Sequence, residues 1–160
     1  EFLKPLADVT NLTEADFVDW GNADNYVKAV GVGECAGVVI DLVATLLVEA
    51  KDKLTFSQEA LNDQKWSDSI YLTYAGFVNA AKALLLAENQ KTNHHAGIID
   101  LFDTVFVETN TIQLATAFKD LVYQIKANEA SEVFAKEYLE QAKAFFATIE
   151  KYREKDLADA

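Results

Sequence analysis

The stretch VIDLVATLLVEAKDKL, residues 39–54, decides the fold of this chain. Its apolar side chains recur at steps of three and four residues, which is the spacing of one face of an α-helix. The residues that follow this spacing are Val39, Leu42, Val43, Leu46, Leu47, Ala50 and Leu54. The pattern predicts a long helix that begins near Glu34 and ends near Asn62.

Four further segments repeat the helical spacing and are separated by short polar breaks. They run from about Trp66 to about Glu88, over Ile98 to Phe106, over Leu114 to Ile125, and from Ser131 onward. Thr109-Asn110-Thr111 can supply an N-cap to the fourth helix. No strand-like alternation follows residue 33, and connections of about four to six residues favour antiparallel neighbours. The sequence therefore predicts an all-α fold, an up-and-down antiparallel bundle of four long helices plus one short helix.

The first part of the chain differs from the rest, because residues 1–33 have little periodic apolar character. We expect an irregular N-terminal extension over residues 1–33, the tail of a preceding domain. The bundle is then expected over residues 34–154, followed by a C-terminal tail over residues 155–160. The chain begins with Glu1 rather than Met, as a piece of a longer protein would, although a tag scar or a processed N-terminus gives the same beginning.

Charge and cysteine content limit the partners that can be expected. The chain carries 14 basic and 26 acidic residues, a formal net charge of −12. Such a surface repels nucleic acid and anionic lipid, which are bound through clustered Lys and Arg. The apolar residues 36–48 are interrupted by Asp41 and are fewer than the about 20 that a membrane-spanning helix takes. Cys35 is the only cysteine, so we expect a cytoplasmic protein without internal disulfides. The charge and the short apolar stretch also lead us to expect neither nucleic acid nor a membrane as a partner.

The segment GVGECAG, residues 31–37, is the sharpest local motif. It fits the spacing G-x-G-x-x-A of a dinucleotide-binding turn, but a charged helix stands where that fold needs a second strand with an acidic end. The glycines are better explained as a tight turn into the first long helix, with Glu34 near its positive end. Cys35 lies in the first helical turn, where the helix dipole favours a thiolate and Glu34 opposes it. Gly33, Glu34 and Cys35 remain candidate binding residues, with a small buried cysteine favoured over a reactive one.

The two histidines, His94 and His95, are adjacent in the sequence. Neighbouring side chains on a helix diverge by about 100°, so they seldom ligate one metal ion. A capping or surface role is favoured, and both are kept as candidate binding residues. Asp100 and Asp103 stand one turn apart, but without a Glu-x-x-His motif they are expected on a solvated face. No catalytic residue and no metal site is predicted.

Several segments resemble the HEPN superfamily of helical bundles, over roughly residues 36–154. They are AAKALLLA at 80–87, HAGIIDLF at 95–102, DLVYQIK at 120–126 and AKAFF at 142–146. HEPN ribonucleases carry an Arg-x4–6-His motif, which is absent because Arg153, the only arginine, follows both histidines. Lys126 stands where many relatives have Arg. The resemblance therefore implies a bundle that has lost ribonuclease activity and that forms a homodimer.

The beginning of the chain is similar to the C-terminal tail of Bacteroidetes-type sirohaem nitrite/sulfite reductase-like proteins. The segments that carry this similarity are VTNL at 9–12, FVDW at 17–20 and VGVGECAGV at 30–38. It implies that reductase modules precede the bundle in a parent chain that binds sirohaem and a 4Fe–4S cluster. The segment itself is expected to hold no cofactor, because the cluster pattern needs several cysteines and only Cys35 exists.

The expected function is therefore that of a non-catalytic accessory or oligomerisation domain. Its expected partners are the preceding domains of its own chain and a second copy of the bundle. Two alternatives stay open. One is a stand-alone HEPN domain that binds a nucleotide or partners a nucleotidyltransferase, and the other is a thiol-dependent activity at Cys35.

Overall fold

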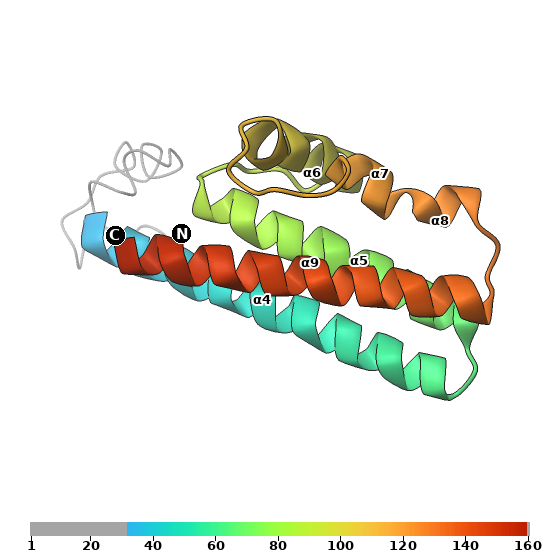
Figure 1. Cartoon of the computed structure of the whole chain (residues 1–160). Coiled ribbons are helices and arrows are strands. Elements are labelled where there is room, and N and C mark those ends of the chain that lie inside the picture. The colour runs from blue at the N-terminus through green and yellow to red at the C-terminus, as the bar shows by residue number, and fades with distance from the viewer. Residues whose placement is uncertain (1–31, 160) are drawn as a thin grey trace, which may run out of the picture. The chain divides into compact units, whose positions relative to one another are not determined.

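The computed structural model describes residues 32–159, with residues 32–37 described for their backbone alone. These residues hold six α-helices, one π-helical segment and no strand, which confirms the all-α class (Figure 1). The elements are α4 Val32–Asn62, α5 Trp66–Ala87, α6 His95–Phe102, η1 Asp103–Val107, α7 Phe118–Val122, α8 Gln124–Ala127 and α9 Glu132–Asp159. The chain divides into two compact units, Glu1–Ile40 and Asp41–Ala160, and the core of the bundle lies within the second.

Helix ends follow from local backbone chemistry. The residues Gln64, Asn89 and Asn110 each have a positive φ, between 57° and 61°, and each stands just after a helical segment. At the end of α5 the N–H of Gln90 donates to the carbonyl of Leu85 at 2.8 Å. This bond closes a Schellman motif around left-handed Asn89. At the other end of the bundle Ser131 Oγ accepts the N–H of Phe134 at 3.1 Å and caps α9.

Helix α9 ends later than the sequence predicts. The helix continues past Glu154 to Asp159, through residues assigned above to a C-terminal tail. Its last two turns still carry partly buried side chains, among them Tyr152 and Arg153. The side chain of Arg153 also donates to the carboxylate of Asp156 at 2.8 Å, an ion pair one turn apart that supports the helical extension.

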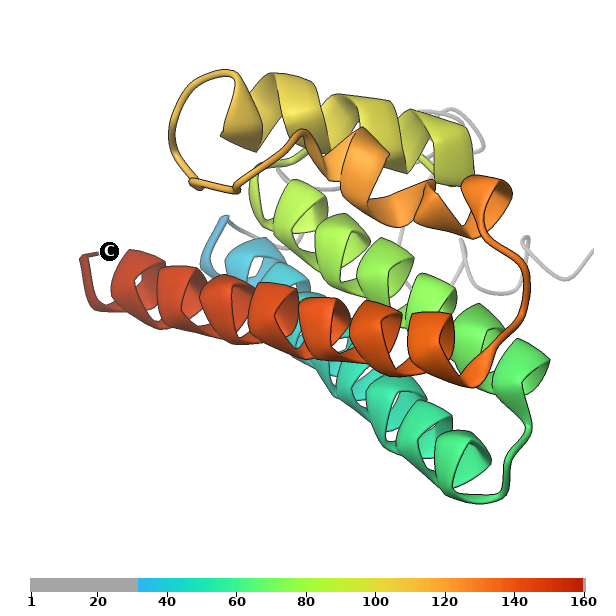
Figure 2. The same ribbon diagram turned by 45° about the vertical axis from the view of Figure 1, so that its right-hand side comes forward.

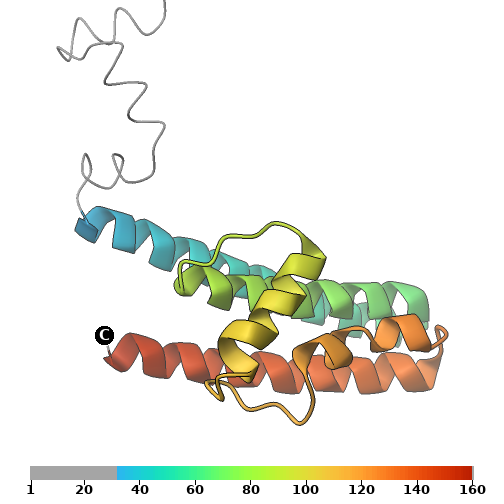
Figure 3. The same cartoon turned by 90° about the horizontal axis from the view of Figure 1, so that it is seen from above.

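The three long helices do not alternate in direction. Phe77 in α5 lies close to Tyr138 and Phe145 of α9, with ring centroids 5.2 and 5.5 Å apart. Burial raises the pKa of Tyr152, further along α9, and the carboxylate of Glu88, just beyond α5, lies near enough to raise it further. Residues late in α5 therefore lie beside residues late in α9, which means that these two helices run parallel. Helix α4 runs antiparallel to both (Figures 1 and 3). The predicted up-and-down arrangement of four long helices is not observed.

The parallel pairing arises from the segment between α5 and α9. Helices α6, α7 and α8 and segment η1 form a second layer over one face of α5 and α9 (Figure 2). Segment η1 follows α6 without a break, and the two cross α5 at a steep angle (Figure 3). This layer carries the chain back to the end where α5 began, so that α9 starts there and runs in the same direction as α5.

The predicted fourth long helix over Leu114 to Ile125 is replaced by the short helices α7 and α8. Left-handed Asn110 turns the chain, and the N–H of Ile112 donates to the carbonyl of Phe106 at 2.9 Å. Thr109 does not cap the next helix, because that helix begins at Phe118 with Ala117 in the N-cap position. The Thr109 hydroxyl instead donates back to the carbonyl of Val105 at 2.7 Å. Helical structure resumes only at Phe118, after an irregular stretch that buries Ile112.

An aromatic cluster joins the two layers. Phe102 of α6 lies 4.6 Å from Phe118 of α7, and Phe118 stacks on Phe145 of α9 at 4.8 Å between ring centroids. Phe77 of α5 meets Phe118 edge-on at 6.1 Å. All four rings are almost completely buried. Aromatic pairs of this kind add about 1 kcal/mol each beyond the area that they bury. The short helices are therefore held by the core and not by their own length.

Within the described residues, one helix, α5, is long and apolar enough to cross a membrane. In this structure α5 is the central helix of the bundle, and 56% of its most apolar stretch is buried against other helices. The core helix of a soluble protein passes the same test, so the finding is weak evidence for a membrane span.

Candidate functional site

The candidate residues of the 31–37 segment lie at the beginning of α4. The helix starts at Val32, before the start predicted near Glu34, so Gly33, Glu34 and Cys35 all have helical backbone. Their side chains lie outside the described residues. A binding role for Gly33, Glu34 and Cys35, and the reactivity of the thiol, stay predictions.

The two candidate histidines take different positions at the start of α6. His94 is the N-cap residue, with an extended backbone and no side-chain capping bond. His95 is the first helical residue, and its Nδ1 lies 3.2 Å from the hydroxyl oxygen of Tyr74 on α5. The described residues contain no group of three or more potential metal ligands. The structure thus pairs His95 with Tyr74, which lies 21 residues earlier in the sequence. The spacing of the two residues in the sequence does not predict this contact.

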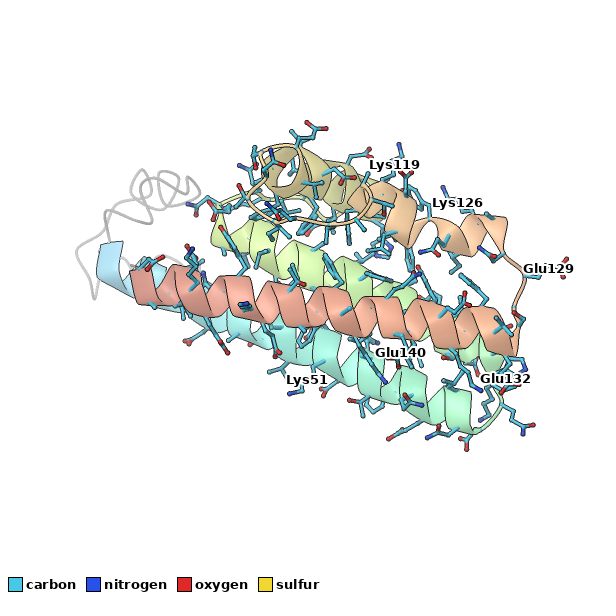
Figure 4. The ribbon with its side chains drawn as sticks, viewed as in Figure 1. Lys51, Lys119, Lys126, Glu129, Glu132 and Glu140 are labelled. Atoms are coloured by element: carbon cyan, nitrogen blue, oxygen red, sulfur yellow. The ribbon has the colours of Figure 1, made fainter. Side chains whose placement is uncertain are left out.

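Tyr74 belongs to a small polar cluster on the surface of the short-helix layer. Burial raises the pKa of Tyr74, and the neighbouring Tyr123 and Tyr71 raise it further. The Tyr74 hydroxyl therefore stays protonated at neutral pH and can donate a hydrogen bond to His95. The Nζ of Lys126 lies 3.8 Å above the centre of the Tyr123 ring. This is a cation–π contact at an exposed site (Figure 4 labels Lys126).

Of the acidic pair Asp100 and Asp103, only Asp100 is exposed. This corrects the expectation that both lie on a solvated face. Asp100 is exposed, and its carboxylate lies 3.7 Å from Lys119 Nζ. Asp103 is only 9% exposed, and both its oxygens accept backbone N–H groups at the start of α7. The role of Asp103 is thus structural, and a carboxylate so occupied has little left to offer a ligand.

Among the described residues, exposed apolar side chains gather on the first half of α4. Val38, Ile40, Leu42 and Val48 are all large apolar residues exposed by 45–59%. In the second half the same helix buries Leu54, Ser57 and Leu61 and exposes charged and polar residues together with one large apolar residue, Phe56. Exposed apolar side chains that gather on one element mark interaction surfaces more often than isolated ones do.

Hollows on the described surface have different linings. A groove of about 400 Å³ lies between α4 and α9, with Leu54 and Phe146 as its apolar floor and Lys51 and Glu150 among its rim residues (Figure 4 labels Lys51). A smaller cavity of about 190 Å³ lies between the end of α5 and the loop that follows it. Neither lining includes a residue that the sequence analysis proposed as a candidate binding residue.

Comparison with known proteins gives one partial similarity. No protein-family model matches the chain, and no solved structure matches it. The chain is 28% identical over 71 residues to a protein of Methanocaldococcus jannaschii that is named a "putative toxin". That match covers 44% of this chain and 53% of the archaeal protein, so the chain spans about half the length of the curated relative that it matches. The similarity covers less than half of the chain and does not assign a family.

Proposed function

We propose that this chain is a non-catalytic helical accessory domain that self-associates through the first half of α4. The observation that carries the proposal is that this half-helix exposes four large apolar side chains, Val38, Ile40, Leu42 and Val48, beside the polar residues Asp41, Thr45 and Glu49. Leu42 and Val43 are adjacent, yet Val43 is 1% exposed and Leu42 is 49% exposed. Successive helical residues point about 100° apart, so α4 presents apolar side chains both to the core and away from it.

Large apolar side chains that gather on the outer side of one helix mark a surface that a partner can cover. The inner face of α4 is covered within the bundle, where Val43 and Ala50 are almost completely buried. The outer face, with Leu42 and Val48, has no such cover in the second unit of the chain. Burial of apolar surface is worth about 25 cal/mol per Å², so a partner on this face gains free energy from several side chains at once.

The occupant that we propose is a second copy of the chain. A twofold pair uses the same patch on both subunits, so one self-complementary half-helix is sufficient to build it, and twofold homodimers are the commonest closed assemblies. Charged Lys51, Asp52 and Lys53 follow the apolar half and limit the contact to residues before them. The α4 helices of two chains would bury their outer faces against each other.

The experiment is a measurement of molar mass by light scattering, with Leu42→Gln and Val48→Gln as test variants. Both variants remove apolar surface without changing charge. The matched control is Val133→Gln, because Val133 is an apolar residue of α9 that is also well exposed, at 67%. We expect the wild type and Val133→Gln to be dimeric and the α4 variants monomeric. A wild-type dissociation constant above about 100 μM, or equal effects of all three substitutions, would exclude the proposal.

A second candidate function is that of a HEPN-like domain that binds a nucleotide or partners a nucleotidyltransferase. The partial similarity to the archaeal "putative toxin" favours it, together with the all-α fold. Titration calorimetry with ATP tests the nucleotide, and induced expression in a bacterial host tests toxicity. Heat of binding or growth arrest supports this candidate, whereas neither effect is expected of a domain that only self-associates.

The proposal of a parent reductase concerns residues upstream of Glu1. A 4Fe–4S cluster takes four thiolates, and this chain has one cysteine, so its residues do not fit that cofactor. Any sirohaem and cluster would therefore be bound by the preceding modules. Sequencing the gene upstream of Glu1 tests this directly, since a start codon immediately before it would exclude the parent chain.

A further inference from the structure

The cavity at the end of α5 has a lining that differs from the rest of the surface. Its floor is formed by Leu85 and Leu86, and its polar lining by Lys82, Gln90, Lys91, Thr92 and Asn93. Both charged side chains are lysines, and the remaining polar groups are amides and a hydroxyl that can donate hydrogen bonds. No carboxylate lines it, although acidic residues outnumber basic ones 26 to 14 in the chain.

Three other hollows of the described surface contain carboxylates. The α4–α9 groove includes Glu150, and the hollow at the α4–α5 hairpin includes Glu59, Asp63 and Asp68. The hollow beside η1 is mainly acidic, with Asp100, Asp103, Glu108 and Asp120. Of these four hollows, the cavity at the end of α5 is the one whose charged lining residues are all lysines.

The backbone of the loop places these donors. The Schellman motif around Asn89 turns the chain back over the end of α5, so that Gln90 and Lys91 follow directly above Leu85 and Leu86. On the other side Thr92 packs against α6, where a Cβ at Gly97 would lie 2.8 Å from Thr92 Oγ1. The missing side chain at Gly97 therefore allows Thr92 its position in the lining.

Neither lysine of the cavity pairs with an acidic residue in the described part of the chain. Four ion pairs join described residues, and neither Lys82 nor Lys91 takes part in any of them. Glu88 is the nearest acidic residue to Lys91 along the chain, and it lies beside Tyr152 of α9, whose pKa is raised by burial and by this carboxylate. Lys82 is half-buried, and a lysine in such a position usually lays its stem on an apolar floor and brings its ammonium group to the rim.

We propose that this cavity binds a phosphate group. Its volume of about 190 Å³ suits a small oxyanion. Sites for drug-sized ligands occupy roughly 300–1,000 Å³, so a whole nucleotide does not fit. Two lysines offset the charge of a phosphate dianion through charge-assisted hydrogen bonds, and the amides and the threonine hydroxyl supply further donors. The phosphate is either a free ion or the terminal group of a larger molecule.

The test is NMR titration of the whole chain with inorganic phosphate at constant ionic strength. Binding is expected to shift the amide signals of residues 90–93 and to saturate. Lys82→Gln and Lys91→Gln should each weaken binding about tenfold, because each removes a charge-assisted bond. The matched control is Lys136→Gln, which removes an exposed lysine of α9 that pairs with Glu132. It changes the net charge equally and should leave the affinity unchanged.

Gly97→Ala is a second test that changes no charge. Its Cβ would displace Thr92 from the lining, so we expect weaker phosphate binding with all lysines in place. The absence of saturable shifts at residues 90–93, or an equal loss in Lys136→Gln, would overturn the proposal. A parallel titration with methyl phosphate distinguishes free phosphate from a phosphate group carried by a larger molecule. Tighter binding of methyl phosphate assigns the site to a phosphate carried by a larger molecule, and weaker binding assigns it to the free ion.

Discussion

The carboxylate of Asp103 accepts the backbone N–H of Phe118 at 2.7 Å, although 15 residues of sequence separate them. Its second oxygen accepts the N–H of Lys119 at 2.9 Å. The first N–H groups of a helix have no partner within the helix, and here a buried side chain from η1 satisfies two of them for α7. One residue therefore fixes where α7 begins and ties it to the π-helical segment.

Asp103→Ala is expected to lower the free energy of unfolding by about 2 kcal/mol, because it leaves two N–H groups near the core without their acceptor. Urea denaturation followed by circular dichroism measures the change. Asp100→Ala is the control, since Asp100 is an exposed carboxylate one turn earlier. Its surface ion pair is worth about 1 kcal/mol at most. If both variants lose a similar free energy of unfolding, the hydrogen bonds of Asp103 to α7 do not stabilise the fold more than a surface ion pair does.

The helices with a clear apolar period could be predicted from the sequence, but their connections could not. The period of α4, α5 and α9 is a local property, and their observed ends lie within a few residues of the predicted ones. The break before α7 depends on Asp103, and the parallel pairing of α5 with α9 depends on how the whole intervening layer packs. Pairings such as Tyr74 with His95, or Lys82 with Lys91 at one cavity, exist only once the chain is folded.

Ser57→Ala should destabilise the α4–α5 hairpin by about 2 kcal/mol, because a buried polar partner is left with an unmade bond. The Ser57 hydroxyl lies 2.7 Å from the Thr73 hydroxyl and donates to the Ser69 carbonyl at 2.8 Å, and all three residues are completely buried. The control is Thr55→Ala, because the Thr55 side chain lies on the exposed side of α4. Surface substitutions of this kind change stability by about 0.5 kcal/mol or less. Equal stabilities of the two variants by urea denaturation would contradict a role for the hydroxyl cluster.

Alkaline pH should destabilise the protein through Tyr138. Burial, with a smaller effect of Tyr74, raises the pKa of Tyr138 far above its ordinary value of 10.0. The unfolded chain therefore loses this proton near pH 10 while the folded protein keeps it, so stability falls as the pH rises above 10. Tyr138→Phe should remove part of this alkaline loss.

The same variant loses the hydrogen bond from the Tyr138 hydroxyl to the Val122 carbonyl, which is 2.7 Å long. It should therefore be less stable than wild type at pH 7 by about 1 kcal/mol and lose less stability between pH 9 and pH 11. Tyr71→Phe serves as the control, because Tyr71 is 65% exposed. Parallel stability curves for wild type and Tyr138→Phe across the alkaline range would contradict this assignment.

Salt should strengthen the proposed dimer. Each copy carries a formal net charge of −12, so two copies repel each other at low ionic strength. The α4 contact is made by apolar side chains such as Leu42 and Val48, whose burial does not depend on ion pairs. Because the screening length falls to about 10 Å at about 0.1 M salt, added sodium chloride removes the repulsion and leaves the apolar gain. Sedimentation equilibrium should therefore show a dissociation constant that falls as salt rises. A dissociation constant that rises with salt would mean that opposite charges hold the two copies together, and the α4 face would not be the contact.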